Sequence, residues 1–226
     1  DDSSVPTPDG PWAYYARYET GGQHPVFCRR PRGRDDGEVV LLHGDTEAAG
    51  RPFWQIAGCE HSPDHRYLAY AVDERGSELY ELRVRDLETG KDLDDRVERV
   101  SGHFEWAEDS ATLFYTVLDD NHRPSQVRRH RLGAPAEQDA VVYDEPDAGF
   151  FVGVGKTESR KYLVIDAHDH QTSEVRLVPA HEPEAEPRLV RPREVGVEYS
   201  VSHHGDRLLI LTNLAGAEDF EIVQAP

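Results

Sequence analysis

The sequence predicts an all-β fold made of repeated antiparallel sheets, and three observations support this. A unit of strand, acidic turn, strand, turn and strand recurs along the chain. Long helical periodicity is missing, and glycine and proline interrupt the sequence every ten residues or so. The repeat length of about 45–50 residues is typical of a β-propeller with four-stranded antiparallel blades. The second strand of successive repeats carries a leucine at matching places, namely Leu68, Leu113, Leu163 and Leu209.

The expected strands follow the alternation of apolar and polar residues, bounded by turn residues. In the first two repeats they cover residues 13–18, 26–30, 39–42, 53–56, 67–72 and 79–84, with a further outer strand after the turn at 88–91. In the third and fourth repeats they cover 103–106, 112–118, 126–132, 140–144, 150–154, 162–166, 173–178 and 188–190. The last repeat holds strands at 197–201, 208–211 and 220–223, and is one strand short.

These strands predict one partial propeller domain over residues 1–226 with no internal domain boundary. The proline- and acid-rich stretch 181–187 falls where a turn between strands is due. The last blade is incomplete. The expected blades cover about 11–45, 53–100, 103–145, 150–191 and 197–226.

Acidic residues in the repeated turns have a structural explanation. Asp64, Asp109 and Asp206 each precede a strand. A carboxylate at such a place accepts hydrogen bonds from backbone N–H groups two residues further on and fixes the turn. We therefore expect these acids to shape turns and not to catalyse a reaction.

Composition limits the functional classes. The chain has 226 residues and a formal charge of −19, which disfavours binding to nucleic acid. We expect the acidic surface to serve solvation, with attraction of cationic substrates as the alternative. No apolar run approaches the roughly 18 residues of a membrane span, and no signal peptide is recognisable, so no membrane partner is expected.

Cysteine and methionine usage bear on location and completeness. Cys28 and Cys59 lie in expected strands with no metal-like spacing, which suits buried thiols in a reducing, cytoplasmic compartment. The chain contains no methionine. We therefore interpret it as a fragment of a longer protein.

Motifs for intrinsic chemistry are missing or weak. No Gly-x-Ser-x-Gly elbow occurs, and Ser62, Ser110 and Ser159 lie in repeat turns. The sequence therefore assigns no catalytic residue.

No cofactor or metal site is assigned either. The histidines of His168-Asp169-His170 and His203-His204 are potential zinc ligands, but no third ligand follows from their spacing. The stretch Gly153-Val154-Gly155-Lys156-Thr157 lacks the upstream glycine of a phosphate loop. Strand aromatics are expected to pack blade against blade and not to stack on nucleic acid, namely Trp54, Trp106, Tyr115 and Phe151.

Several segments of the sequence form a recognisable set. They are Asp9-Gly10-Pro11-Trp12 with Tyr14, Ser62-Pro63-Asp64, Asp86-Leu87-Glu88-Thr89-Gly90, Arg123-Pro124, Val127-Arg128-Arg129-His130-Arg131-Leu132-Gly133, Thr172-Ser173-Glu174-Val175-Arg176-Leu177, Gly196-Val197-Glu198-Tyr199 and His204-Gly205-Asp206-Arg207. Together they resemble the N-terminal propeller of the oligopeptidase B (protease II) branch of the prolyl oligopeptidase family of serine peptidases, and the resemblance covers nearly the whole chain. One local departure is Leu42-His43-Gly44-Asp45, where the family more often has an aspartate directly after the leucines.

The resemblance implies a seven-bladed propeller joined to a catalytic α/β-hydrolase domain, which holds the serine, aspartate and histidine. This chain would be about four and a half of the seven blades. It would cap the active site without catalysing the reaction and admit only short peptides, which the parent enzyme cuts after arginine or lysine. None of the triad maps onto this sequence. The expected partners are the hydrolase domain and peptide substrates, and uncovered blade edges predict self-association.

The alternative is a stand-alone propeller scaffold for protein–protein interaction, like WD-repeat proteins. It predicts Gly-His and Trp-Asp pairs in each blade. Only Gly102-His103 occurs, and there is no Trp-Asp pair. A third option, a self-contained propeller enzyme using carboxylates or a metal, lacks an identifiable constellation of residues.

Overall fold

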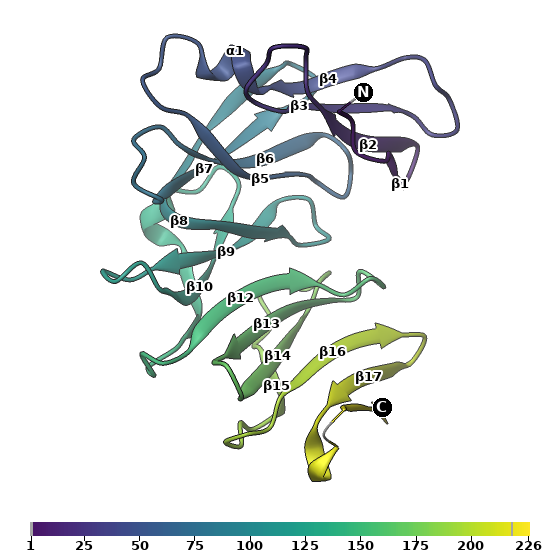
Figure 1. Ribbon diagram of the computed structural model, residues 1–226, viewed down its shortest axis with the longest axis vertical. Helices are drawn as coiled ribbons and strands as arrows, with labels where there is room; N and C mark the ends of the chain where they lie inside the picture. Colours follow the sequence, from purple (N-terminus) through teal and green to yellow (C-terminus); the bar gives the residue numbers. More distant parts are fainter. Residues whose placement is uncertain (1, 218) are drawn as a thin grey trace.

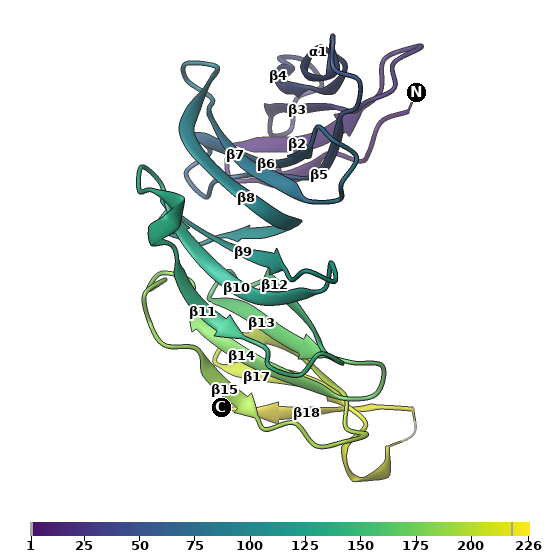
Figure 2. The same ribbon diagram turned by 90° about the vertical axis from the view of Figure 1, so that its left-hand side faces the viewer.

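The computed structural model describes residues 2–217 and 219–226 and is almost entirely β-structure (Figure 1). Its four sheets contain four, seven, four and three strands, and all paired strands are antiparallel. The sheets follow one another along the long axis in chain order (Figure 2). The expected all-β fold of antiparallel sheets is confirmed.

The first sheet has the order β1-β2-β3-β4. Its strands are β1 (Thr7–Asp9), β2 (Trp12–Arg17), β3 (Val26–Pro31) and β4 (Val39–His43), and the short helix α1 (Gly44–Ala48) follows. The sequence pattern does not predict β1, because this strand has only three residues and Pro8 at its centre cannot donate a ladder hydrogen bond.

The seven-stranded sheet runs from β5 to β11 in sequence order. Its elements are β5 (Gln55–His61), β6 (Tyr67–Asp73), β7 (Tyr80–Asp86), β8 (Lys91–Trp106), β9 (Thr112–Leu118), β10 (Pro124–Arg131), the 3₁₀ turn η1 (Ala136–Gln138) and β11 (Ala140–Asp144).

The sequence predicted a break between residues 100 and 103, but β8 continues through it. Val100 pairs with Tyr80 of β7 and also with Val117 of β9. The register then shifts before Phe104, and Gly102 adopts φ +96°. A Cβ on Gly102 would lie 2.5 Å from the Ala57 Cβ, so only glycine fits this bend. We propose that the bend separates the second and third blades.

The last two sheets have the orders β12-β13-β14-β15 and β16-β17-β18. Their strands are β12 (Phe151–Lys156), β13 (Tyr162–His168), β14 (Ser173–Pro179), β15 (Arg188–Arg191), β16 (Tyr199–His204), β17 (Arg207–Thr212) and β18 (Glu221–Ala225), with the 3₁₀ turn η2 (Leu214–Gly216) before β18. The final sheet thus has the three expected strands.

The core lies between neighbouring sheets and also inside the seven-stranded sheet, where side chains of β6 and β7 pack against those of β8 and β9. Leu68, Leu113 and Leu163 are buried as their repeat position predicts, whereas Leu209 is only half-buried because the last sheet packs on one neighbour. The expectation of buried aromatics holds for Trp54, Trp106 and Tyr115. It is wrong for Phe151, which is 43% exposed, because strand alternation turns Phe150 inward instead. Within the described part of the chain, no helix is long and apolar enough to cross a membrane.

A candidate functional site at the inner turns

Four turns lie toward the same side of the molecule, namely those between β1 and β2, β5 and β6, β8 and β9, and β12 and β13 (Figure 1). They comprise residues 10–11, 62–66, 107–111 and 157–161. Side chains in and beside these turns contact one another from sheet to sheet. We call these contacts, together with the link from the fourth turn to β16, the inner-turn belt.

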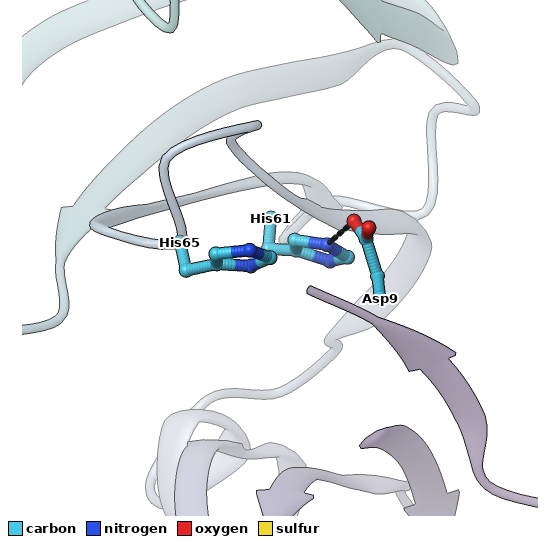
Figure 3. A group of neighbouring side chains, drawn as sticks. All are labelled: Asp9, His61 and His65. Carbon is cyan, nitrogen blue, oxygen red and sulfur yellow. Dashed lines mark hydrogen bonds and ion pairs between the residues drawn. The ribbon is translucent and has the colours of Figure 1, made fainter. Parts of the chain in front are cut away.

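The first link of the belt joins β1 to the end of β5. His61 Nε2 and Asp9 Oδ2 lie 2.8 Å apart (Figure 3). The Tyr14 ring stacks on the His61 ring with a centroid distance of 3.6 Å. The Tyr14 hydroxyl also shares a 2.8 Å hydrogen bond with His65 Nδ1. Asp9, His61 and His65 therefore come together although they are far apart in the sequence.

The turn between β5 and β6 holds His65 in place. The Ser62 hydroxyl accepts a hydrogen bond from the Tyr67 N–H at 2.9 Å, and the Ser62 carbonyl accepts one from the His65 N–H at 2.8 Å. His65 adopts φ +64°, the left-handed conformation that such tight turns require. The Ser62-Pro63-Asp64 segment thus positions the imidazole.

Arg160, in the turn between β12 and β13, connects the third sheet to the first and second sheets. Its Nη1 lies 3.0 Å from Asp9 Oδ1 and its Nη2 lies 3.0 Å from Glu108 Oε2. Lys156 Nζ lies 3.0 Å from Glu108 and 3.2 Å from Glu105. The Glu108 side chain is only 8% exposed, so its two cationic partners offset the cost of burying its charge.

Neutral hydrogen bonds complete the belt. The Asp64 N–H donates to Ser110 Oγ at 3.0 Å, and Trp106 Nε1 donates to the Glu60 carbonyl at 3.1 Å. Ser159 Oγ and His203 Nδ1 lie 2.9 Å apart and connect the fourth turn to β16. The belt therefore joins all the sheets from β1 to β16.

Burial and charge act against each other in these groups. Burial lowers the pKa of His61 and of His65, and nearby guanidinium groups lower it further, although Asp9 pulls both values upward. Burial tends to raise the pKa of Glu108, but Arg160 and Lys156 outweigh this and lower it. The belt therefore combines neutral imidazoles with ionised carboxylates at neutral pH.

The turn acids identified from the sequence behave in two ways. Asp64 Oδ1 accepts the Arg66 N–H at 3.1 Å, and Asp109 Oδ1 accepts the Ala111 N–H at 2.9 Å, as predicted. Asp206 does not follow this prediction. Its carboxylate is 91% exposed and lies 3.5 Å from the side-chain Nε of Arg207.

The other sequence candidates do not assemble into a catalytic site. The side-chain hydroxyls of the three turn serines all form hydrogen bonds within or between turns, namely those of Ser62, Ser110 and Ser159. His168 pairs with Asp166 on the exposed end of its hairpin, away from His203, which bonds to Ser159. In the described residues, the group of side chains able to hold a metal ion is instead Asp9, His61 and His65.

A cavity of about 340 Å³ lies beside Asp9 and His61, between the first two sheets. Cys28 and Cys59 both line it as free thiols, which fits the expectation of strand cysteines. Burial raises the pKa of Cys28 to about 11. At neutral pH this thiol stays protonated and poorly reactive.

Comparisons with known proteins agree with this architecture. Residues 1–226 match the family described as the prolyl oligopeptidase N-terminal β-propeller domain. The chain is 39% identical over its full length to dipeptidyl aminopeptidase BI of Pseudoxanthomonas mexicana, and 33% identical over 98% of its length to protease 2 of Moraxella lacunata. It spans 33% of each of those relatives.

Solved structures show the same likeness. Oligopeptidase B from Leishmania major superposes on the whole chain with a TM-score of 0.94 and 30% sequence identity, and the match covers 33% of that protein. Oligopeptidase B from Trypanosoma brucei gives a TM-score of 0.91 at 31% identity, over 99% of this chain and 32% of that protein. The chain belongs to the prolyl oligopeptidase family and is part of its N-terminal β-propeller domain.

Proposed function

We propose that this chain is the gating and size-filter part of an oligopeptidase B-like serine peptidase that cleaves short peptides after arginine or lysine. The catalytic step belongs to an α/β-hydrolase domain of the parent protein, the chain's main partner. The sequence similarity to oligopeptidase B and protease 2 supports the parentage, and the chain spans about a third of those relatives.

The inner-turn belt is the observation that carries the filter role. Charged and neutral contacts tie the turns of successive sheets together, from Asp9 through Glu108 and Arg160 to His203. Such cross-links resist separation of the blades. A ring whose inner edge cannot widen excludes folded proteins by size and admits extended peptides, while closure keeps the active site dry.

The charge of the chain supports a preference for basic peptides. The formal net charge is −19, and an acidic surface attracts cationic peptides over a distance of about 10 Å at 0.1 M salt. Raising the ionic strength should therefore slow peptide capture by the parent enzyme. A rate of capture that does not change with salt would contradict this part of the proposal.

Peptide hydrolysis by the full-length protein tests the function. We expect cleavage after arginine or lysine in short peptides, little cleavage of folded proteins, and a rate that falls as peptides lengthen. The isolated residues 1–226 should show no hydrolysis. Equal cleavage of short peptides and folded proteins would contradict the filter, and cleavage after other residues would contradict the specificity.

Two further expectations belong to this proposal. The free cysteines suit a reducing, cytoplasmic location. Ile222, 69% exposed, and Leu211, 46% exposed, lie on the last two strands and give the isolated chain an apolar surface for self-association. A monomer of 25.5 kDa in light scattering at high protein concentration would contradict self-association.

A further inference from the structure

We propose that Asp9, His61 and His65 bind one divalent transition-metal ion of the zinc class, which fastens the β1–β2 turn to the β5–β6 turn. One ligand atom from each residue lies within 4.8 Å of the other two (Figure 3). These residues form the first link of the inner-turn belt, but metal binding is measured without peptide hydrolysis, so this inference and the proposed function can fail separately.

The donor set selects the class of metal. Two imidazole nitrogens and one carboxylate oxygen suit Zn²⁺, Co²⁺ or Ni²⁺, whereas Ca²⁺ and Mg²⁺ prefer oxygen ligands. Three protein ligands also leave a fourth tetrahedral position open for water. Ligand atoms on such an ion lie roughly 3.3 Å apart for bonds of about 2.0–2.1 Å. His61 Nε2 and Asp9 Oδ2, now 2.8 Å apart, need to separate only slightly.

Tyr14 supplies the outer support that metal-binding histidines need. Its hydroxyl bonds His65 Nδ1 at 2.8 Å, which leaves Nε2 of that ring for the metal. With a metal on Nε2, the Nδ1–H donates to the Tyr14 oxygen. The same Tyr14 ring lies parallel to the His61 ring, with an angle of 4° between the planes. Such outer partners fix the orientation of the ligand rings.

Gly10 lets the His65 ring pack closely against the turn that carries Asp9. A Cβ at this position would lie 2.4 Å from His65 Nε2, the nitrogen assigned to the metal, and would displace the ring. Gly10 also adopts φ +52°, which other residues rarely do. Glycine at position 10 therefore allows the nitrogen that Tyr14 does not use to lie close to Asp9.

Arg160 also pairs with Asp9, so the metal ion has to share this carboxylate with the guanidinium group. It binds Asp9 through Oδ1, whereas His61 contacts Oδ2. The metal takes Oδ2, and Arg160 keeps both Oδ1 and its second partner, Glu108. The carboxylate thus bridges the metal and the guanidinium group.

Calorimetric titration of the metal-free chain with Zn²⁺ tests the site. We expect one tight ion per chain that Ca²⁺ does not displace. His61→Gln and Asp9→Asn each remove a ligand and should weaken binding at least about tenfold. Tyr14→Phe keeps the ring stack but loses the hydrogen bond, and should weaken binding by about 10–100-fold.

His168→Gln is the matched control, because it removes an imidazole that also pairs with an aspartate but lies on an exposed hairpin. It should leave the tight Zn²⁺ binding unchanged. Equal Zn²⁺ affinity in the wild type and in Asp9→Asn or His61→Gln would overturn the proposal. Loss of binding in His168→Gln would also overturn it.

A thermal-melt readout separates metal loss from misfolding. Zn²⁺ should raise the Tm of the wild type and of His168→Gln, and should leave the Tm of folded His61→Gln unchanged. If His61→Gln does not fold, Tyr14→Phe decides, since it changes one hydroxyl only. A Zn²⁺-dependent rise in Tm as large in Tyr14→Phe as in the wild type, at Zn²⁺ below saturation, would contradict the assigned geometry.

Discussion

The buried His130 and the half-buried His61 both pair with aspartate, but their surroundings shift their pKa values in opposite directions. His130 lies between Asp95 Oδ1 at 2.9 Å and Asp139 Oδ1 at 2.8 Å, and its side chain is 1% exposed. His61 has one carboxylate partner, Asp9, and its side chain is 17% exposed. Burial alone would lower the pKa of both rings.

The number of carboxylate partners decides whether the pKa of the histidine is raised or lowered. Hydrogen bonds and charge from Asp139 and Asp95 outweigh burial and raise the pKa of His130. For His61 burial prevails over the single Asp9, and the charges of His65 and Arg160 add to it, so the pKa is lowered. Folding therefore favours the protonated form of His130, which we call the brace together with Asp95 and Asp139, and the neutral form of His61 in the inner-turn belt.

The two regions also connect different parts of the fold. The brace joins β8, β10 and the segment after η1, and the Tyr115 hydroxyl donates to Asp139 Oδ2 at 2.7 Å. The belt joins the turns of separate sheets. We therefore expect the brace to govern stability and the belt to govern which peptides pass.

The largest expected effect comes from His130→Gln. The change leaves Asp95 and Asp139 buried without their cation, and should lower the free energy of unfolding by about 3–5 kcal/mol. Urea denaturation measures this. His168→Gln, which breaks an exposed pair with Asp166, should cost under about 1 kcal/mol and serves as the control. Similar losses for both variants would contradict the brace.

Glu108→Gln should have the next largest effect. It removes the negative charge shared by Lys156 and Arg160, and should cost about 1.5–3 kcal/mol in the same denaturation experiment. Asp206→Asn alters an exposed acid of an equivalent turn and should cost almost nothing. If Asp206→Asn lowers the free energy of unfolding and Glu108→Gln does not, the belt is not what holds the sheets together.

Gly10→Ala should lower the free energy of unfolding by roughly 1–2 kcal/mol, because alanine is strained at φ +52°. The new methyl group would also displace His65. Chemical shifts of the His65 ring would report the displacement. Gly33→Ala is the matched control, since it has a similar strain at φ +77° but an open environment. An undisturbed His65 ring in Gly10→Ala would contradict the packing described here.

The pH dependence of stability separates the brace from other groups. Because the pKa of His130 is raised in the folded chain, its contribution is fully present below the unfolded value of 6.5 and is lost as pH rises through the folded pKa. The stability difference between wild type and His130→Gln should therefore shrink as pH increases above 6.5. A stability difference that grows with pH would contradict the conclusion that folding favours protonated His130.

Much of the fold follows from local pattern, but the contacts of the belt do not. Alternation and turn acids such as Asp64 and Asp109 predicted strands and turns, because both depend on neighbouring residues. Asp9 meets His61 52 residues away and Arg160 151 residues away, and no spacing rule encodes such pairs. Even so, the resemblance of Asp9-Gly10-Pro11-Trp12 and Ser62-Pro63-Asp64 to the family pattern marked both segments of the site.

We expect the belt, and not the brace, to set the size filter. In the full-length protein, the rate of hydrolysis of long relative to short arginine peptides should be measured for wild type, Glu108→Gln and His130→Gln, at a temperature where all three are folded. The ratio should rise in Glu108→Gln and stay at the wild-type value in His130→Gln. An unchanged ratio in Glu108→Gln, or an equal rise in both variants, would contradict this.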